Sequence, residues 1–203
     1  MGRKSDAKQR LLQTASQLFW QKNCTSVSVD QICNDAGVNK GSFYHFFSSK
    51  TEIILAVIEA AWEELRDKLL EPAFAPDISP LKRIERFFSQ TEFMQIAGSE
   101  SEGYIPGCRF CNLSSEMYAL DPEVRERIVE IQNRQKFYLK NALQEASDAG
   151  DFSGDISQTA SAVYSLFVGA LLQAKVQNDI KPLRESKECI KLITGKASQQ
   201  TLK

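Results

Sequence analysis

Residues 25–50, TSVSVDQICNDAGVNKGSFYHFFSSK, decide the fold of this chain. Ser28 can cap a helix through an S-x-x-Q capping box, in which two side chains satisfy free backbone N–H groups. The apolar residues that follow are spaced at i, i+3, i+4 and i+7 and form one helical stripe: Val29, Ile32, Cys33 and Ala36. Gly37 ends this helix, and Asn39 can cap a shorter helix over residues 40–46. Two short helices joined by a turn of about three residues, with glycine at its start, predict a helix-turn-helix.

Helical periods continue on both sides of this stretch, and no segment alternates apolar and polar residues for long enough to predict a strand. Ser49 can cap a long helix through a second capping box, S-x-x-E. The sequence predicts an all-α fold of about nine helices, with residues 1–48 as a three-helix DNA-binding domain and residues 49–203 as a C-terminal helical bundle. The other helices are expected over residues 6–22, 49–71, 79–98, 108–119, 121–150 and 156–177, with a last one after Pro182.

Composition and charge suit a cytoplasmic protein with one basic end. The chain is 42% hydrophobic and 25% charged, as in ordinary soluble proteins. Residues 1–52 carry a charge of +3, whereas the whole chain carries -1, so a basic end is joined to an acidic remainder. We expect no membrane span, because no apolar run approaches about 18 residues, and no secretory signal in the charged start MGRKSDAKQR. Five cysteines, an odd number, favour reduced thiols in a cytoplasm.

The stretch from Thr25 to Lys50 resembles the DNA-binding signature of the TetR family of bacterial repressors. The shared pattern is a Thr-rich helix start, an Ile-small pair, Ala-Gly-Val, then Gly-Ser-Phe-Tyr-x-x-Phe and Ser-Lys. Asn23, Cys24 and Cys33 depart mildly from this pattern. The resemblance implies a homodimer that binds a palindromic double-stranded DNA operator and releases it when an effector binds the C-terminal domain.

The resemblance also implies which side chains contact DNA. The family places the short second helix of the motif in the major groove, with the N-terminal half nearest the bases. Tyr44 resembles the phosphate-contacting tyrosine of the family, whereas Phe43, Phe46 and Phe47 are expected in the core. The predicted DNA-binding residues are Thr25, Ser26, Lys40, Gly41, Ser42, Tyr44, His45 and Lys50.

The family builds its dimer interface from the last two long helices, here residues 156–177 and 182–194. The first of these is apolar on nearly all sides, which indicates burial against two partners. In one interpretation, a second subunit is one of these partners. In the other, the helix lies in the core of a single subunit. Aromatic candidates for lining an effector pocket are Tyr104, Phe110, Phe137, Tyr138 and Tyr164.

A second motif, GCRFCNLSSE at residues 107–116, resembles TetR-type regulators that respond to reactive electrophiles or oxidants. Cys108 is expected at a helix N-terminus, where the helix dipole favours a thiolate. We hypothesise that Lys175 approaches Cys108 and that the pair forms a sensor. The alternative is a small packed cysteine and a lysine whose alkyl stem covers apolar surface.

Other functions are less well supported by the residues. Cys108 and Cys111 form a C-x-x-C, but a zinc site would need a second ligand pair, and a thioredoxin-type site would need βαβ surroundings. We predict no catalytic residues, no metal and no cofactor, and hence a repressor that is not an enzyme. Two alternatives stay open: a thiol oxidoreductase that uses Cys108 and Cys111, and a helical interaction protein that does not bind DNA.

Overall fold

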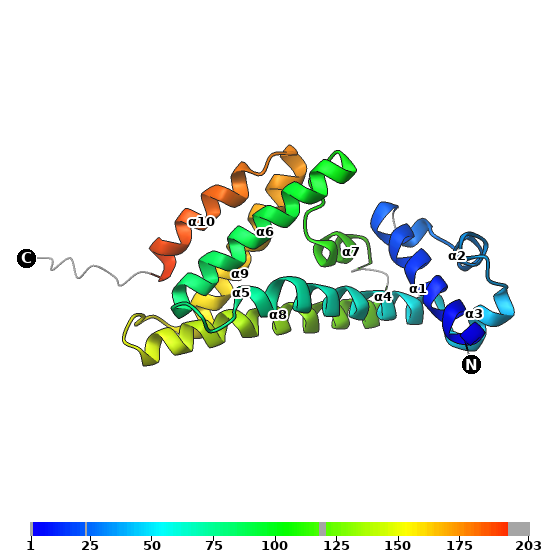
Figure 1. Cartoon of the computed structure of the whole chain (residues 1–203), viewed down its shortest axis with the longest axis horizontal. Coiled ribbons are helices and arrows are strands. Elements are labelled where there is room, and N and C mark those ends of the chain that lie inside the picture. The colour runs from blue at the N-terminus through cyan, green and yellow to red at the C-terminus, as the bar shows by residue number, and fades with distance from the viewer. Residues whose placement is uncertain (1, 23, 118–120, 195–203) are drawn as a thin grey trace, which may run out of the picture. The chain divides into compact units, whose positions relative to one another are not determined.

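A computed structural model describes residues 2–22, 24–117 and 121–194, and within these ranges every regular element is helical. The prediction of an all-α fold is confirmed. The elements are α1 (Gly2–Gln21), η1 (Cys24–Ser26), α2 (Val29–Ala36), α3 (Lys40–Phe46), α4 (Lys50–Leu65), the π-helical turn η2 (Arg66–Leu70), α5 (Glu71–Ala73), α6 (Pro80–Glu102), α7 (Arg109–Met117), α8 (Pro122–Asp148), α9 (Ile156–Gln177) and α10 (Lys181–Thr194) (Figure 1).

The chain divides into two compact units. The first unit comprises residues 1–64 and 109–131, and so contains α1 to α3, nearly all of α4, α7 and the start of α8. The second unit comprises residues 65–108 and 132–203, with α5, α6, the rest of α8, α9 and α10. The single helix α8 therefore contributes to both units.

The first unit is built on the apolar stripes that the sequence predicts. Leu11, Ala15, Leu18 and Phe19 of α1 are buried, as are Ile32, Cys33 and Ala36 of α2. Phe43 of α3 and Ile53 of α4 are fully buried among them. Complete burial of one such large side chain contributes about 1.5–3 kcal/mol, so these few residues hold the short helices in place.

Two helix ends differ from the prediction. The expected helix over 49–71 is interrupted by a π-helical turn at Arg66–Leu70, and helical backbone continues to Ala73. Pro72 has no N–H to donate, and the continuous helical backbone ends one residue later, at Ala73.

The helix expected to end near Gly98 instead continues to Glu102 and ends at Gly103, whose φ of 80° is left-handed. Gly98 is therefore inside α6, where glycine costs about 1 kcal/mol relative to alanine. A Cβ at Gly98 would lie 2.7 Å from Cγ of Pro106. Glycine is needed there because the returning loop passes directly against the helix.

Aromatic rings form the core of the second unit. Phe87 and Phe88 of α6 lie with their ring centroids 4.5 and 5.3 Å from that of Phe167 on α9. Arg83 is only 7% exposed, and its guanidinium donates to the backbone oxygen of Ile78 (3.0 Å) and to Glu145 (2.6 Å). This buried cation therefore links α6 to α8 through Glu145.

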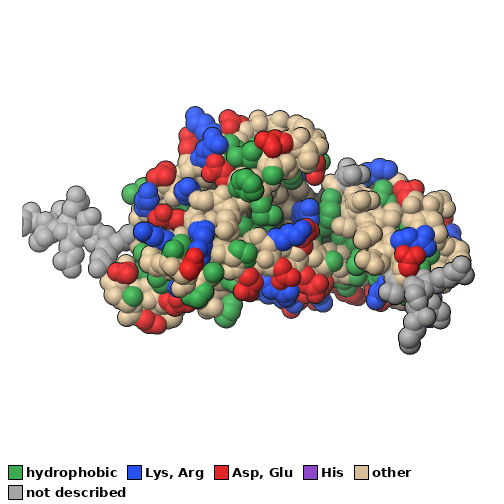
Figure 2. Space-filling model, viewed as in Figure 1, with side chains coloured by type: hydrophobic (Ala, Val, Ile, Leu, Met, Phe, Trp, Pro, Cys, Tyr) green, Lys and Arg blue, Asp and Glu red, His purple; other side chains and the backbone are tan. Residues whose placement is uncertain are grey.

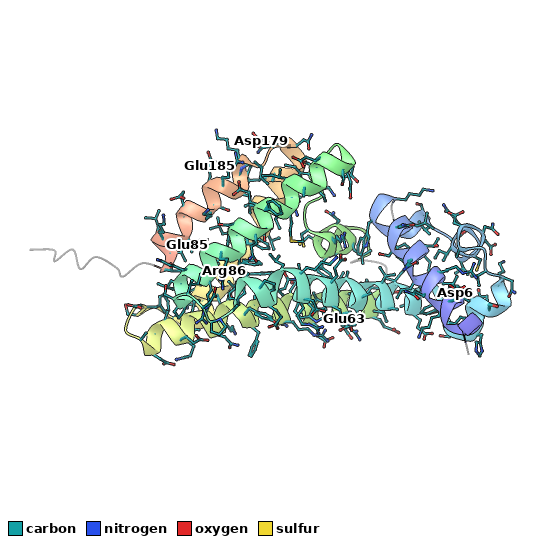
Figure 3. The ribbon with its side chains drawn as sticks, viewed as in Figure 1. Asp6, Glu63, Glu85, Arg86, Asp179 and Glu185 are labelled. Atoms are coloured by element: carbon teal, nitrogen blue, oxygen red, sulfur yellow. The ribbon has the colours of Figure 1, made fainter. Side chains whose placement is uncertain are left out.

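Arg86, labelled in Figure 3, holds the loop that joins α5 to α6. Its guanidinium donates to the carbonyl oxygens of Ala73 (2.8 Å) and Ala75 (2.7 Å) and pairs with Asp77 (2.7 Å). The pKa of Asp77 is lowered, mainly by its hydrogen bond with Arg86.

The apolar helix α9 is long enough to cross a membrane by length and composition alone. Seven of its residues are instead buried in the second unit, where it packs against α10. Core helices commonly pass the same composition test, so α9 is weak support for a membrane span.

Acidic and basic side chains are interspersed over the face shown in Figure 2.

Candidate nucleic-acid interface

Local hydrogen bonds set the geometry of α2, the turn and α3. The Ser28 hydroxyl accepts from the backbone N–H of Gln31 (3.1 Å), and the Asn39 side chain accepts from that of Ser42 (2.8 Å). Gly37 adopts a left-handed φ of 62° and ends α2. The sequence predicted both caps and the glycine, because each depends on neighbours within three or four positions.

The short helix α3 has two chemically different faces. Phe43 is fully buried and the following Phe47 is 3% exposed, so they anchor the helix. The opposite face presents exposed Lys40, Gly41, Tyr44 and His45, with Ser42 half-buried. Polar groups that a duplex would meet therefore project from a helix whose aromatic side is fixed.

Packing within the subunit does not require glycine at position 41. A Cβ there would have Asn39 Oδ1 as its nearest atom, at an ordinary contact distance of 3.4 Å. Alanine would be the better helix former at this position. Glycine has no side chain and leaves the backbone open on the exposed side of α3.

The side chain of Arg10 on α1 holds the turn through a long-range hydrogen bond. The Arg10 guanidinium donates to the carbonyl oxygen of Ala36 (3.0 Å), at the C-terminal end of α2. Asp6, labelled in Figure 3, pairs with the same arginine at 3.5 Å. Arg10 and Ala36 are 26 residues apart, so no local pattern could have shown this contact.

Lys50 interacts with backbone carbonyls at the other end of the motif. Its ammonium donates to the carbonyl oxygens of Cys24 (2.7 Å) and Thr25 (3.2 Å), which belong to η1. A lysine in the first turn of α4 opposes the helix dipole. The carbonyl oxygens of η1 offset that cost, and the side chains of Thr25 and Ser26 remain exposed on the same turn.

Lys40 already has an acidic neighbour. Its Nζ lies 2.5 Å from Oδ1 of Asp30, in the first turn of α2, and both side chains are largely exposed. The hydrogen bond with Asp30 is the main reason that the pKa of Lys40 is raised. Lys40 therefore stays cationic, but a phosphate would have to compete with Asp30 for it.

The helix α7 packs beside η1 within the first unit. Arg109 at its start lies 5.8 Å from the centre of the Trp20 ring and pairs with Glu64 at 3.0 Å. Phe110 is 4% exposed, so this pocket candidate is packed in the first unit with the DNA-binding helices.

The loop before Cys108 is fastened within the second unit. The Gln95 amide bonds Gly107 in both directions, accepting from its N–H (2.8 Å) and donating to its carbonyl oxygen (3.2 Å). A Cβ at Gly107, whose φ is 73°, would lie 3.0 Å from Cδ of Lys175. The alkyl chain of Lys175 thus packs against the residue before the half-buried Cys108.

The other pocket candidates differ in their exposure. Tyr104 and Phe137 are on the surface, 43% and 60% exposed, while Tyr164 is buried. Tyr138 is half-buried and donates to Glu71 at 2.5 Å. Burial, followed by this hydrogen bond, raises the pKa of Tyr138 to about 12.

The cysteines show no metal or disulfide arrangement. All five lie in the described part of the chain, and none forms a disulfide. Across residues 2–22, 24–117 and 121–194, no three His, Cys, Asp or Glu side chains come together as metal ligands. Cys108 belongs to the second unit and Cys111 to the first. Burial raises the pKa of the Cys33 thiol.

Comparisons with known proteins agree with this geometry. Residues 11–57 match the family described as bacterial regulatory proteins, tetR family, and residues 80–190 match the Tetracyclin repressor-like, C-terminal domain. The chain is 30% identical to the HTH-type transcriptional repressor NemR of Escherichia coli, over 93% of this chain and 94% of that protein. It is 32% identical to the transcriptional regulator AcuR of Cereibacter sphaeroides, over 87% of this chain and 80% of that protein.

Comparison of the fold with solved structures agrees with the sequence matches. The crystal structure of reduced E. coli NemR superposes with a TM-score of 0.79 at 27% identity, over 95% of this chain and 99% of that chain. These matches support neither a thiol oxidoreductase nor a helical interaction protein that does not bind DNA. Together with the exposed polar face of α3, they show that this chain is a DNA-binding transcriptional regulator and belongs to the TetR family.

Proposed function

We propose that this regulator is a repressor that binds a palindromic operator as a homodimer and is released by a small molecule or by thiol modification. The observation that carries the proposal is the two-sided α3, with Phe43 buried and Lys40, Tyr44 and His45 exposed. Binding to an operator places the protein in the cytoplasm with the DNA.

In the proposed complex, the N-terminal half of α3 enters the major groove. Lys40, Ser42 and His45 reach base edges or phosphates, and the open backbone at Gly41 allows close approach. Tyr44 donates to a phosphate, and Thr25 and Ser26 contribute hydroxyls from η1. Lys50 supports this arrangement by holding the carbonyl oxygens of η1.

Selection of bound fragments from the source genome, followed by titration at several salt concentrations, tests the DNA contacts. Replacing Lys40 with methionine removes one cation, so log K should depend less steeply on log salt, by about 0.9 per subunit. Lys82→Met, which removes an exposed lysine of α6 in the second unit, is the matched control. Equal slopes for the two variants contradict a phosphate role for Lys40.

An exposed apolar stripe on α9 and α10 supports the homodimer. Leu172 and Val176 of α9 are 58% and 77% exposed, and Leu192 of α10 is 84% exposed. Gly169 lies on the same stripe, and a Cβ there would meet no atom of the subunit within 4 Å. Burying these side chains against a second copy is favourable, and a two-fold operator requires two recognition helices about one DNA turn apart.

Two features of the second unit support a thiol sensor. The bonds between Gln95 and Gly107 hold the loop that ends at Cys108, and the alkyl chain of Lys175 lies against Gly107. A thiolate at Cys108 would add to the β-carbon of an α,β-unsaturated carbonyl compound, so that a C–S bond forms while the C=C π bond breaks and the α-carbon takes a proton from water. A nearby ammonium would favour the thiolate.

Competitive labelling with N-ethylmaleimide, read by mass spectrometry, tests the sensor. Cys189 is exposed whereas Cys108 is half-buried, so exposure alone predicts that Cys189 reacts first. We expect Cys108 to react faster, and Lys175→Met to slow Cys108 without affecting Cys189. Labelling of Cys108 no faster than of Cys189 contradicts the proposal.

A further inference from the structure

Two amide atoms buried in the second unit have no hydrogen-bond partner among the described residues. They are Nε2 of Gln135 on α8 and Oε1 of Gln90 on α6. Gln135 as a whole is only 4% exposed. The first atom is a hydrogen-bond donor and the second is an acceptor.

Each glutamine lies one helical turn from a member of one aromatic cluster in the second unit. The ring centroids of Phe87 on α6 and Tyr138 on α8 lie 5.6 and 5.5 Å from that of Phe74. Gln90 is three residues after Phe87, and Gln135 is three residues before Tyr138. Three residues are nearly one helical turn, so each glutamine lies on the same helix face as its aromatic neighbour.

Unpaired buried amides are unusual in a folded protein, because each loses its hydrogen bonds to water. Gln95, one further turn along α6, shows the ordinary arrangement, since both of its amide atoms bond Gly107. A leucine at either position would avoid the cost of desolvating an amide. A polar group from outside the chain could supply the hydrogen bonds that these two atoms lack.

We propose that Gln90 and Gln135 form a binding subsite for a neutral, flat small molecule with a carboxamide-like group. The ligand acceptor would take the N–H of Gln135, its donor would bond Gln90 Oε1, and its body would stack on the Phe87 and Tyr138 layer. This inference rests on the proposed effector-dependent function and assigns residues and a ligand chemistry to the effector site.

Neutrality follows from the groups at the site. Glutamine side chains carry no net charge, and an unpaired buried anion is far more costly than a neutral polar group. Arg83, two turns before Gln90 on the same stripe, is already bonded to Glu145 and to the Ile78 carbonyl. Met94, one turn after Gln90, is 40% exposed and can adapt to ligands of different shape.

Benzamide is a suitable probe, because it combines an aromatic ring with one neutral amide. Saturation-transfer NMR and calorimetry on the full chain should show saturable binding of benzamide and weaker binding of benzoate. Gln135→Leu and Gln90→Leu should each weaken benzamide binding roughly three- to tenfold, the worth of one hydrogen bond. Gln144→Leu, an exposed change on α8, should leave binding unchanged.

Thermal unfolding of the same variants separates lost binding from lost folding. We expect neither leucine variant at positions 90 and 135 to melt below the wild type, because each removes an unsatisfied group without opening a cavity. Absence of saturable benzamide binding overturns the proposal, as does binding that Gln90→Leu leaves unchanged. Operator binding in the absence of benzamide is measured in parallel. If the chain binds benzamide but no operator, only the repressor assignment fails.

Discussion

Lys50→Met tests whether the cation at the start of α4 stabilises the helix-turn-helix. Methionine retains the apolar stem and removes both hydrogen bonds from Nζ to η1. A hydrogen bond to a charged group contributes about 1.5–3 kcal/mol, but the bond to Thr25 is exposed and long. Relief of the opposed helix dipole returns only a few tenths of a kcal/mol. We therefore expect the free energy of unfolding to fall by about 1–2 kcal/mol.

Tryptophan fluorescence suits this measurement, because both tryptophans of the chain, Trp20 and Trp62, lie in the first unit. Urea unfolding followed at this signal reports the unit that contains Lys50. Lys82→Met removes the same charge from the second unit and should leave the transition unchanged. If the Lys50 and Lys82 variants unfold at the same urea concentration, the carbonyl contacts do not stabilise η1 and the reasoning is wrong.

DNA binding by the same variant distinguishes positioning from direct contact. If Lys50 acts through η1, operator affinity falls while its salt dependence stays as in the wild type. A direct phosphate contact would lower the slope of log K against log salt by about 0.9 per subunit. We expect an unchanged slope, because the ammonium is already directed at two backbone oxygens.

Three other predictions follow from single contacts. Gly98→Ala should lower the free energy of unfolding by about 1–3 kcal/mol despite the better helix propensity of alanine, because its Cβ would meet Pro106. Urea unfolding at constant m-value measures this change, and a gain in stability contradicts the prediction. Gly169→Ala should weaken the dimer in sedimentation experiments, whereas propensity alone predicts a gain of about 1 kcal/mol. Tyr138, with its pKa raised to about 12 from an ordinary 10, contributes stability that is complete below pH 10 and lost as the pH rises towards 12. Tyr138→Phe should flatten this alkaline decline in urea titrations; an unaltered decline excludes the tyrosine as its cause.

Local sequence patterns predicted the motif in detail. The bounds of α2 and α3, both caps and the left-handed Gly37 agree with expectation. The burial of Phe43 and Phe47 and the exposure of Tyr44 also agree, whereas Phe46, which was expected in the core, is half-buried. Longer elements were predicted less well at their ends, because Gly98 is a typical helix terminator whose role inside α6 depends on the distant Pro106.

Residue type alone does not determine where the aromatic pocket candidates lie in the fold. Aromatic character alone proposed Tyr104 and Phe137, which are exposed, and Phe110, which packs in the other unit. The polar glutamines at positions 90 and 135 carried no pattern that distinguishes them from surface residues. The burial of their amide atoms arises only in the folded second unit.

The sequence by itself determined the all-helical class, the helix-turn-helix and its family, because caps and apolar periods depend on residues within about four positions of each other. Only the tertiary structure decided what Arg10 and Lys50 do, since their carbonyl partners lie 26 residues away. It also decided which amides are buried without partners. The physical reason is that burial and long-range hydrogen bonds are properties of packed helices, which the period of any one helix does not specify.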